Sequence, residues 1–299
     1  MYFQTKEDFA DEVMVINMKF KDKLIVSDID GTFFNSKSQV VPRNLEAVEY
    51  FKRNGGRFTI ATGRVPESMG RLAPYIETLA NTPVICCNGA VSYDFIHHVR
   101  TGDVTIDSAR ASELIHLVER DFPAVGIRIS SRTGYLIPRL NDYIVRELAD
   151  HVERLKADDM YHVGELEELT PEGWTRVAFC AASDELDRLR AAVEGEYSKY
   201  FSFSKASAEI YEFQDGSATK GTAIDKLRRY LISSGAASES LCVYAVGDYE
   251  NDLDMLRRCD IPACPSNAIP AVKDIAKIQL CSCDDGAIAD LIEKIEASL

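Results

Sequence analysis

The sequence predicts an α/β protein with a Rossmann-like parallel-sheet core and an inserted α+β cap domain. From residue 23 to about 90, and again from about 214, short apolar runs alternate with helical patterns, which is typical of a parallel sheet with crossover helices. Between these parts apolar residues alternate with small or charged ones, as in half-buried antiparallel strands. We therefore expect a tail at 1–22, a core at 23–92 and 212–299, and a cap at 93–211.

The first part of the core is expected to contain strands joined by crossover helices. The first helix has Pro42 near its entrance, Leu45, Val48 and Phe51 at regular helical spacing, and Gly55 at its end. The expected elements are, in order, the strand KLIVSD (23–28), a helix at 42–54, the strand RFTIATG (57–63), a helix near 66–79 and the strand PVICCNG (83–89).

The insert is expected to combine helices with alternating strands, and the core pattern then resumes. The segment YDFIHHVR (93–100), with His97 and His98, is interpreted as a polar strand rather than a substrate contact. Further elements of the insert are helices at 108–121 and 183–195 and the strands AVGIRIS (124–130), YFSFS (200–204) and EIYEF (209–213). The core continues with a helix at 222–234, the strand LCVYAVGD (241–248), a helix at 252–259, a short strand near Ile261, a helix after Pro270 and a closing helix at 287–297.

Composition excludes several classes of function. The chain has 299 residues and a formal charge of −14, which argues against general binding of nucleic acid or of an anionic membrane. Its eight cysteines are scattered without Cys-x-x-Cys spacing, as in a reduced, cytoplasmic protein. The first residues lack the features of a signal peptide, and no apolar stretch is long enough for a membrane span. Both a monomer and a homodimer stay open.

Two carboxylates, Asp28 and Asp30, follow the first apolar run and precede Gly31 in the motif DIDGT. Like charges held a few Å apart repel each other, and proteins tolerate this where a cation, a proton or a reaction uses the pair. A polar cap on the strand is the plainer interpretation. An EF-hand is excluded, because Phe33 and Gln39 occupy its glycine and bidentate-acid positions.

A second acidic cluster stands at the end of another buried strand, in GDYENDLDML (247–256). Its polar residues are Asp248, Asn251 and Asp252. The carboxyl ends of parallel strands form the ligand crevice of an open α/β sheet, so this cluster should meet Asp28 and Asp30. Hard oxygen ligands at two strand ends favour Mg²⁺, which keeps open positions for water and a substrate phosphate.

Two further positions suit a phosphate group. Thr62, at the end of the second core strand, offers a hydroxyl beside Gly63, where backbone amides can approach an anion. Lys220, directly before a helix, could place an ammonium near the same anion. Taken alone, the first is only a turn and the second only a surface lysine.

Together these motifs resemble a known family. The ordered set DIDGT, ATGR, KG and GDYENDLDML resembles the four motifs of the haloacid dehalogenase superfamily of aspartate-nucleophile phosphatases. The insert between the second and third motifs is similar to the cap of its Cof-type, class IIB members. NGA (88–90), SNA (266–268) and DDGAIADLI (284–292) resemble further elements of that subfamily. Phe33 and Phe34 depart from its pattern, as does PACPSNA (262–268), and none of these changes alters a charged position.

The resemblance implies a division of labour between the two aspartates. Asp28 would attack phosphorus and become an aspartyl-phosphate, and Asp30 would protonate the leaving oxygen and later activate water. Mg²⁺ would be held by Asp28, the backbone carbonyl of Asp30, and Asp248, with Asp252 in or next to the coordination shell. The cation would offset the repulsion between a carboxylate and an anionic phosphate.

The resemblance also implies a phosphate-binding set. Thr62 and Lys220 would hold the phosphoryl oxygens and absorb the charge that develops in transfer. Additional candidates for contacts to the phosphate or to the near end of the substrate are Gly63, Arg64, Asn88 and Asn251.

The function implied is that of a Mg²⁺-dependent phosphatase of small phosphorylated metabolites, such as sugar phosphates, nucleotides or pyridoxal phosphate. Alternatives are a phosphomutase of the same superfamily and a non-catalytic protein that binds phosphorylated metabolites. The presence of Asp28, Asp30, Lys220 and Asp248 weighs against the non-catalytic protein, because a pure binder needs no nucleophile and acid together.

Overall fold

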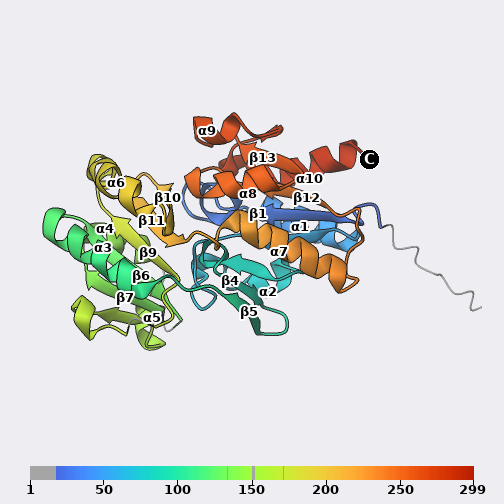
Figure 1. The fold of residues 1–299 in the computed structure, drawn as a ribbon. Helices are drawn as coiled ribbons and strands as arrows, with labels where there is room; N and C mark the ends of the chain where they lie inside the picture. Colours follow the sequence, from blue (N-terminus) through green and yellow to red (C-terminus); the bar gives the residue numbers. More distant parts are fainter. Residues whose placement is uncertain (1–17, 133, 150–151, 171) are drawn as a thin grey trace, which may run out of the picture.

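The computed structural model describes residues 18–132, 134–149, 152–170 and 172–299 and shows an α/β core with a separate layered insert (Figure 1). The core is built on a five-stranded parallel sheet in the order β14-β13-β12-β1-β2. Its strands are β1 (Lys23–Ser27), β2 (Arg57–Ile60), β12 (Cys242–Val246), β13 (Ile261–Pro265) and β14 (Ile278–Leu280). The predicted fold class, a parallel-sheet core with an inserted α+β domain, is confirmed.

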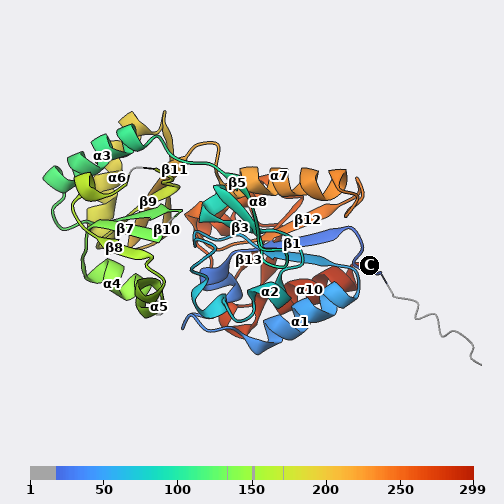
Figure 2. The ribbon, with the colours of Figure 1, turned by 90° about the horizontal axis from the view of Figure 1, so that it is seen from below.

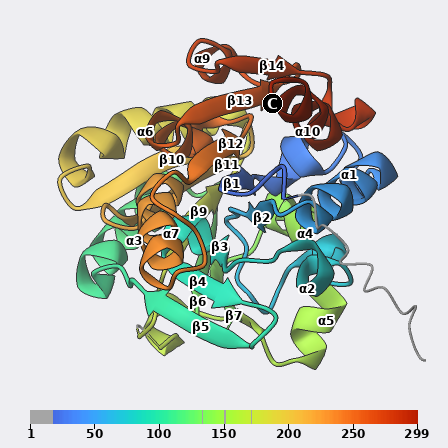
Figure 3. The same ribbon diagram turned by 90° about the vertical axis from the view of Figure 1, so that its right-hand side faces the viewer.

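Helices cover both faces of this sheet, which explains why its strands are continuous apolar runs. Ile25 of β1 packs in the cluster with α1 and α10, whereas Leu24 and Val26 pack in the cluster with α7. Figure 3 shows the sheet between α7 on one side and α1 and α10 on the other. The core helices are α1 (Pro42–Arg53), α2 (Ile76–Leu79), α7 (Lys220–Ser233), α8 (Leu253–Arg258), α9 (Pro270–Lys273) and α10 (Ala287–Ala297).

The insert is a six-stranded sheet in the order β10-β11-β9-β6-β7-β8. Figure 2 shows α3 and α6 above this sheet and α4 and α5 below it. The strands are β6 (Gly126–Ser131), β7 (Gly134–Arg139), β8 (Tyr161–Val163), β9 (Arg176–Cys180), β10 (Phe201–Ser207) and β11 (Ile210–Asp215). The helices are α3 (Ser108–Asp121), α4 (Asp142–Leu148), α5 (Val152–Ala157) and α6 (Ser183–Tyr197).

A small three-stranded sheet, β3-β4-β5, stands beside the core sheet. It consists of β3 (Val84–Cys86), β4 (Val91–Asp94) and β5 (Val99–Asp103). Val104 donates a backbone hydrogen bond to Ala90, and Ile106 donates one to Trp174 of the insert. The expected boundaries at 92/93 and 211/212 therefore divide β4 and β11. We propose instead that the insert comprises residues 105–215.

Two local expectations were wrong. The helix expected near 66–79 is present only as a short turn at Gly70–Leu72 and as α2, because Gly70 has a φ of +56° and Pro74 interrupts the backbone ladder. The segment YDFIHHVR (93–100) is strand only at its two ends, in β4 and β5, and its middle part, 95–98, with His97 and His98, is the turn that joins them. His98 there adopts a left-handed φ of +54°.

The tail expected at 1–22 lies mostly outside the described residues, since the structure describes it only from residue 18. Phe20 is fully buried, and its ring lies 4.7 Å from that of Phe51 on α1. The last residues of the expected tail therefore belong to the core. No helix in the described part of the chain has both the length and the apolar character needed to cross a membrane.

This packing gives a prediction about stability. Phe20→Ala should lower the free energy of unfolding by about 3 kcal/mol or more, because it removes a fully buried ring. Denaturant titration measures the loss. Met18→Ala is the control, since Met18 is 49% exposed and its loss should change little. Equal effects of the two substitutions would show that residue 20 is not part of the core.

Candidate active site

The candidate site is formed where β1 and β12 end side by side. The two strands pair in parallel, with Ser27 opposite Val246. Asp28 continues β1, and its backbone NH donates to the carbonyl of Val246 at 2.9 Å. Asp248 follows β12 after Gly247, so strand register brings residues far apart in sequence to one edge of the sheet.

A buried group of acids surrounds the Lys220 ammonium. Asp28, Asp248 and Asp252 each offer a carboxylate oxygen, and these oxygens lie within 4.8 Å of one another. Lys220 Nζ donates to Asp28 Oδ1 at 2.5 Å and to Asp252 Oδ1 at 2.7 Å. Lys220 and Asp252 are fully or almost fully buried. One ammonium thus faces several buried carboxylates, and its single positive charge does not balance them.

The pKa values of these groups follow from their burial and from this imbalance of charge. Burial raises the pKa of Asp28 well above its ordinary value; Lys220 opposes the rise, and Asp252 and Asp248 add to it. Burial, together with the charge of Asp252, raises the pKa of Asp248 to about 7. Burial opposes the charged form of Lys220, but the carboxylates of Asp252 and Asp28 outweigh it and raise the pKa of the ammonium. A divalent cation would satisfy the acids that Lys220 alone does not.

Local backbone structure brings the acids this close. Gly31 has a φ of +77°, and a Cβ there would lie 2.5 Å from Asp248 Oδ2, so no side chain fits. The neighbouring Thr32 hydroxyl donates to Asp248 Oδ1 at 2.9 Å. Asp252 Oδ2 accepts hydrogen bonds from the backbone NH groups of Asp248, at 2.9 Å, and of Tyr249, at 3.2 Å. These bonds fix the orientation of the acids at the strand ends.

Asp30 lies apart from the buried group, although only one residue separates it from Asp28. Its side chain is 57% exposed, and both carboxylate oxygens accept from the Arg64 guanidinium at 3.2 Å. The turn at 29–33 therefore presents one aspartate to the buried acids and the other to open space. This difference in environment is the kind that separates the tasks of two carboxylates.

The segments that follow β2 of the core sheet and β3 of the small sheet supply the polar turn opposite these acids. The Thr62 side chain is buried, and its hydroxyl accepts from the backbone NH of Arg64 at 3.1 Å. Asn88 donates its backbone NH to the carbonyl of Thr62 at 2.9 Å and has a left-handed φ of +49°. Gly63, between Thr62 and Arg64, lines the adjoining cavity.

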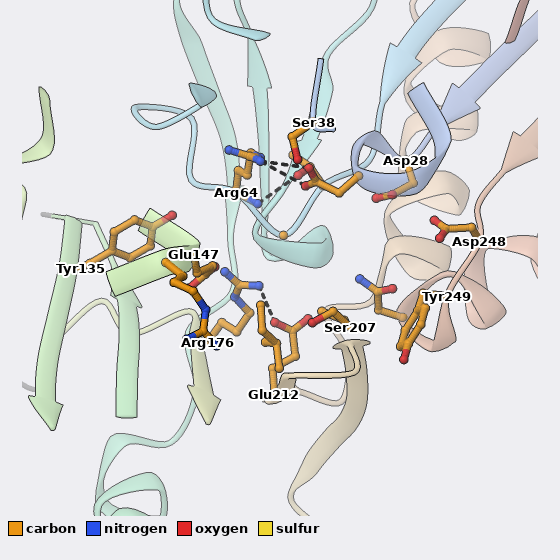
Figure 4. A pocket seen from close by; sticks show the side chains of 17 residues that line it. Asp28, Ser38, Arg64, Tyr135, Glu147, Arg176, Ser207, Glu212, Asp248 and Tyr249 are labelled. Carbon is orange, nitrogen blue, oxygen red and sulfur yellow. Dashed lines mark hydrogen bonds and ion pairs between the residues drawn. The ribbon is translucent and has the colours of Figure 1, made fainter. Parts of the chain in front are cut away.

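A cavity of about 300 Å³ opens above these residues, between the core and the insert (Figure 4). Seven of the ten predicted site residues line it: Asp28, Asp30, Thr62, Gly63, Arg64, Asp248 and Asn251. The other three reach its lining through hydrogen bonds: Lys220 to Asp28, Asp252 to Asp248, and Asn88 to Thr62. The structure therefore brings all ten predicted residues to one region.

Sequence reasoning missed the residues that the insert contributes to this cavity. Tyr135 of β7, Glu147 of α4, Arg176 of β9 and Glu212 of β11 all line it. Figure 4 shows these side chains opposite Asp28 and Arg64. A signal was present in TRVAFC and EIYEF, because each places a charged residue, Arg176 or Glu212, directly beside apolar residues of a strand. Such a residue needs a partner when buried.

Comparison with known proteins identifies the family. A family model described as haloacid dehalogenase-like hydrolase matches residues 25–292. The chain therefore belongs to the haloacid dehalogenase-like hydrolases, as its motifs predicted.

Curated relatives match over nearly their whole length. Pyridoxal phosphate phosphatase YbhA of Escherichia coli is 24% identical, over 90% of this chain and 97% of the relative. The 5-amino-6-(5-phospho-D-ribitylamino)uracil phosphatase YitU of Bacillus subtilis is 22% identical, over 93% and 98%. Among solved structures, the subclass IIB sugar phosphatase BT4131 superposes with a TM-score of 0.75 at 17% identity, covering 92% of this chain and 99% of that one. The last likeness supports the fold.

The acid group gives a prediction about pH and stability. A carboxyl whose pKa is raised in the folded state destabilises that state increasingly as pH rises from the ordinary value of 3.8 to the folded value of about 7. Asp248→Asn removes this penalty. In EDTA at pH 8 the variant should therefore be more stable than the unsubstituted protein by a few kcal/mol, and at pH 4 the difference should nearly vanish.

Thermal unfolding with and without MgCl₂ measures this effect. Mg²⁺ should raise the midpoint of the unsubstituted protein at pH 8 and leave that of Asp248→Asn almost unchanged. Asp121→Asn is the control, because Asp121 lies on α3 of the insert, outside the acid group, and pairs with Arg120 at 2.7 Å. An Asp248→Asn protein that is less stable than the unsubstituted protein in EDTA at pH 8 would contradict this explanation.

Proposed function

We propose that this chain, a phosphoric monoester hydrolase by family, is a Mg²⁺-dependent phosphatase of small phosphorylated metabolites that acts through an aspartyl-phosphate on Asp28. One observation carries the proposal above the others. Asp28 stands at the floor of a cavity in hydrogen-bond contact with Lys220, within a group of acids that needs a further cation. A nucleophile, its electrostatic support and a space for substrate therefore coincide.

The residues present fit a magnesium ion. Asp28 and Asp248 would hold it, with the backbone carbonyl of Asp30, and Asp252 would orient the group through its bonds to the Asp248 and Tyr249 amides. When bound, Mg²⁺ supplies positive charge that keeps the carboxylates ionised and offsets the charge of a phosphate dianion. All of these donors are oxygens, which suits a hard cation.

Asp28 is the proposed nucleophile. Lys220 stabilises its ionised form from 2.5 Å, and its carboxylate lines the cavity, where a phosphorus atom can approach. Asp30 is the proposed general acid and base. It lies more exposed on the same cavity, where Arg64 orients both of its oxygens. It would protonate the leaving oxygen as the bond to phosphorus breaks, and later take a proton from the attacking water.

Thr62 and Lys220 are the proposed partners of the phosphoryl oxygens, with Gly63, Arg64, Asn88 and Asn251 around them. The buried Thr62 and its neighbour Gly63 line the same cavity as Asp28. Donors fixed before the reaction stabilise the charge that develops on a transferring phosphoryl group without having to reorganise.

The proposed substrates are sugar phosphates, nucleotides or pyridoxal phosphate. A cavity of about 300 Å³ lined by Tyr135, Glu147 and Ser207 of the insert suits a small polar leaving group. The named relatives act on pyridoxal phosphate and a phosphoribitylaminouracil. Phosphate release from a metabolite panel tests the proposal: transfer to a second sugar position without release would indicate a phosphomutase, and binding without turnover a non-catalytic protein.

We also propose that the enzyme works in the cytoplasm as a monomer or homodimer, without nucleic-acid or membrane partners. The net charge of −14 supports the exclusion of polyanionic partners. The described residues include all eight cysteines, and each of these is a free thiol. That pattern is typical of a reducing compartment.

The roles of the two aspartates can be separated by leaving group. In Asp30→Asn, a sugar phosphate should hardly react because its alkoxide needs a proton, whereas p-nitrophenolate can leave unaided. p-Nitrophenyl phosphate should therefore give a burst of nitrophenolate close to one equivalent per active site, followed by slow turnover. Stopped-flow absorbance measures the burst. Asp28→Asn is the control and should show neither burst nor turnover; equal loss for both substrates in Asp30→Asn, without a burst, would refute the assigned role.

The proposed metal can be tested by exchange. EDTA should abolish phosphate release and Mg²⁺ should restore it. Ca²⁺ should restore it poorly, because its longer bonds and looser coordination would misplace the attacking carboxylate. Initial rates after dialysis against each ion give the comparison. Equal rates with Ca²⁺ and Mg²⁺, or full activity in EDTA, would argue against this site.

A further inference from the structure

A buried chain of side chains connects the insert to the phosphate-binding turn of the core. Arg176 of β9 donates to Glu212 Oε2 of β11 at 2.5 Å, and Asn88 Nδ2 of the core donates to the other oxygen of Glu212 at 2.5 Å. Register pairs Glu212 with Ala178, so Glu212 and Arg176 lie on the same face of the insert sheet. Figure 4 shows this pair below Arg64, on the cavity wall.

The burial of these groups is unusual for a site that binds an anion. Arg176 is 5% exposed, Glu212 1% and Asn88 2%. A carboxylate beside a phosphate site repels its ligand, and a buried charge without a partner destabilises the fold. The placement of Glu212 is explained if Arg176 neutralises its charge and its two carboxylate oxygens hold Arg176 and Asn88 in position.

The Arg176 guanidinium lies directly against the proposed phosphate-binding turn. A Cβ at Gly63 would lie 2.5 Å from Arg176 Nη1, so only glycine leaves room for this contact. Arg176 Nε and Asn88 Oδ1 are buried and have no hydrogen-bond partner among the described residues. Arg176 and Asn88 therefore each keep a polar atom close to the cavity that could still form a hydrogen bond.

The core segment that contains Asn88, which Glu212 contacts, has a strained backbone. Cys87 and Asn88 both have a φ of +49°, a region that residues with a side chain rarely adopt in succession. Gln214, also on β11, donates to the backbone carbonyl of Asn88 at 3.3 Å and to that of Ala218, just before Lys220. Strand β11 thus contacts two core loops that carry proposed phosphate ligands.

We propose that Arg176 and Glu212 are positioning residues, through which the insert holds the Thr62–Gly63 turn and Asn88 in the shape that binds the phosphoryl group. This inference rests on the proposed phosphatase function. The insert then acts on every phosphomonoester, whatever its leaving group. A residue that only recognised the leaving group would affect metabolites and spare a small aryl phosphate.

The test compares two substrates in matched variants. In Glu212→Gln, which keeps the size of the side chain, kcat should fall about a hundredfold for a hexose phosphate and for p-nitrophenyl phosphate alike, with little change in KM. Arg176→Ala should behave in the same way, and guanidinium chloride at non-denaturing concentrations should restore part of its turnover. Arg176→Lys should retain more turnover than Arg176→Ala.

Control variants come from an exposed pair on the same insert. Arg120 and Asp121 of α3 interact at 2.7 Å and lie outside the cavity lining, so Arg120→Ala and Asp121→Asn should leave both rates unchanged. Thermal melts establish that each variant is folded at the assay temperature. If Arg176→Ala is not, Glu212→Gln and Arg176→Lys decide the result.

Other outcomes would overturn the inference. A fall in kcat with the hexose phosphate alone would make Arg176 a contact of the leaving group. Unchanged kcat with both substrates would show that Arg176 and Glu212 have no role in turnover. Failure of the proposed function looks different. In that case the unsubstituted protein would release no phosphate, or Asp28→Asn would release it equally well.

Discussion

The molecule depends on the contact of one buried ammonium with two buried carboxylates. Lys220 lies 2.5 Å from Asp28 and 2.7 Å from Asp252; Lys220 and Asp252 are almost fully buried, and Asp28 lines the cavity. Removing charges from water is costly, and a buried ion pair recovers that cost only with good geometry and further hydrogen bonds. Burial raises the pKa of Asp28 and Asp248, and the neighbouring carboxylates, which outnumber the single lysine, add to the rise. The fold therefore holds more carboxylates together than one lysine can neutralise, and a bound cation would supply the missing positive charge.

The arrangement of strands, helix and glycine brings these charged groups together. Adjacent parallel strands end at the same edge, α7 begins at Lys220, and Gly31 removes the side chain that would separate the acids. Together these features place the charges at one edge of the sheet. The insert adds its own buried pair, Arg176 and Glu212, on the opposite wall. Two charged networks thus face one cavity.

Much of this arrangement could be predicted from the sequence because the informative signals are local. Helices α3 and α10 begin and end at the predicted residues, 108–121 and 287–297. Apart from Lys220, which begins α7, the site residues of the core lie just after apolar strands, so strand order implied their proximity. The Arg176–Glu212 pair could not be predicted, since it depends on the register between β9 and β11. The helix near 66–79 was expected too long because the backbone demands of Gly70 and Pro74 outweighed its apolar spacing.

The most direct test of the account is the stereochemical course at phosphorus. A phosphorothioate monoester made chiral with oxygen isotopes would be hydrolysed in isotopically labelled water, and the configuration of the released thiophosphate determined by phosphorus NMR. Attack by Asp28 followed by attack of water inverts phosphorus twice, so the account predicts overall retention. Inversion would mean that water attacks the substrate directly, and would contradict the covalent role of Asp28.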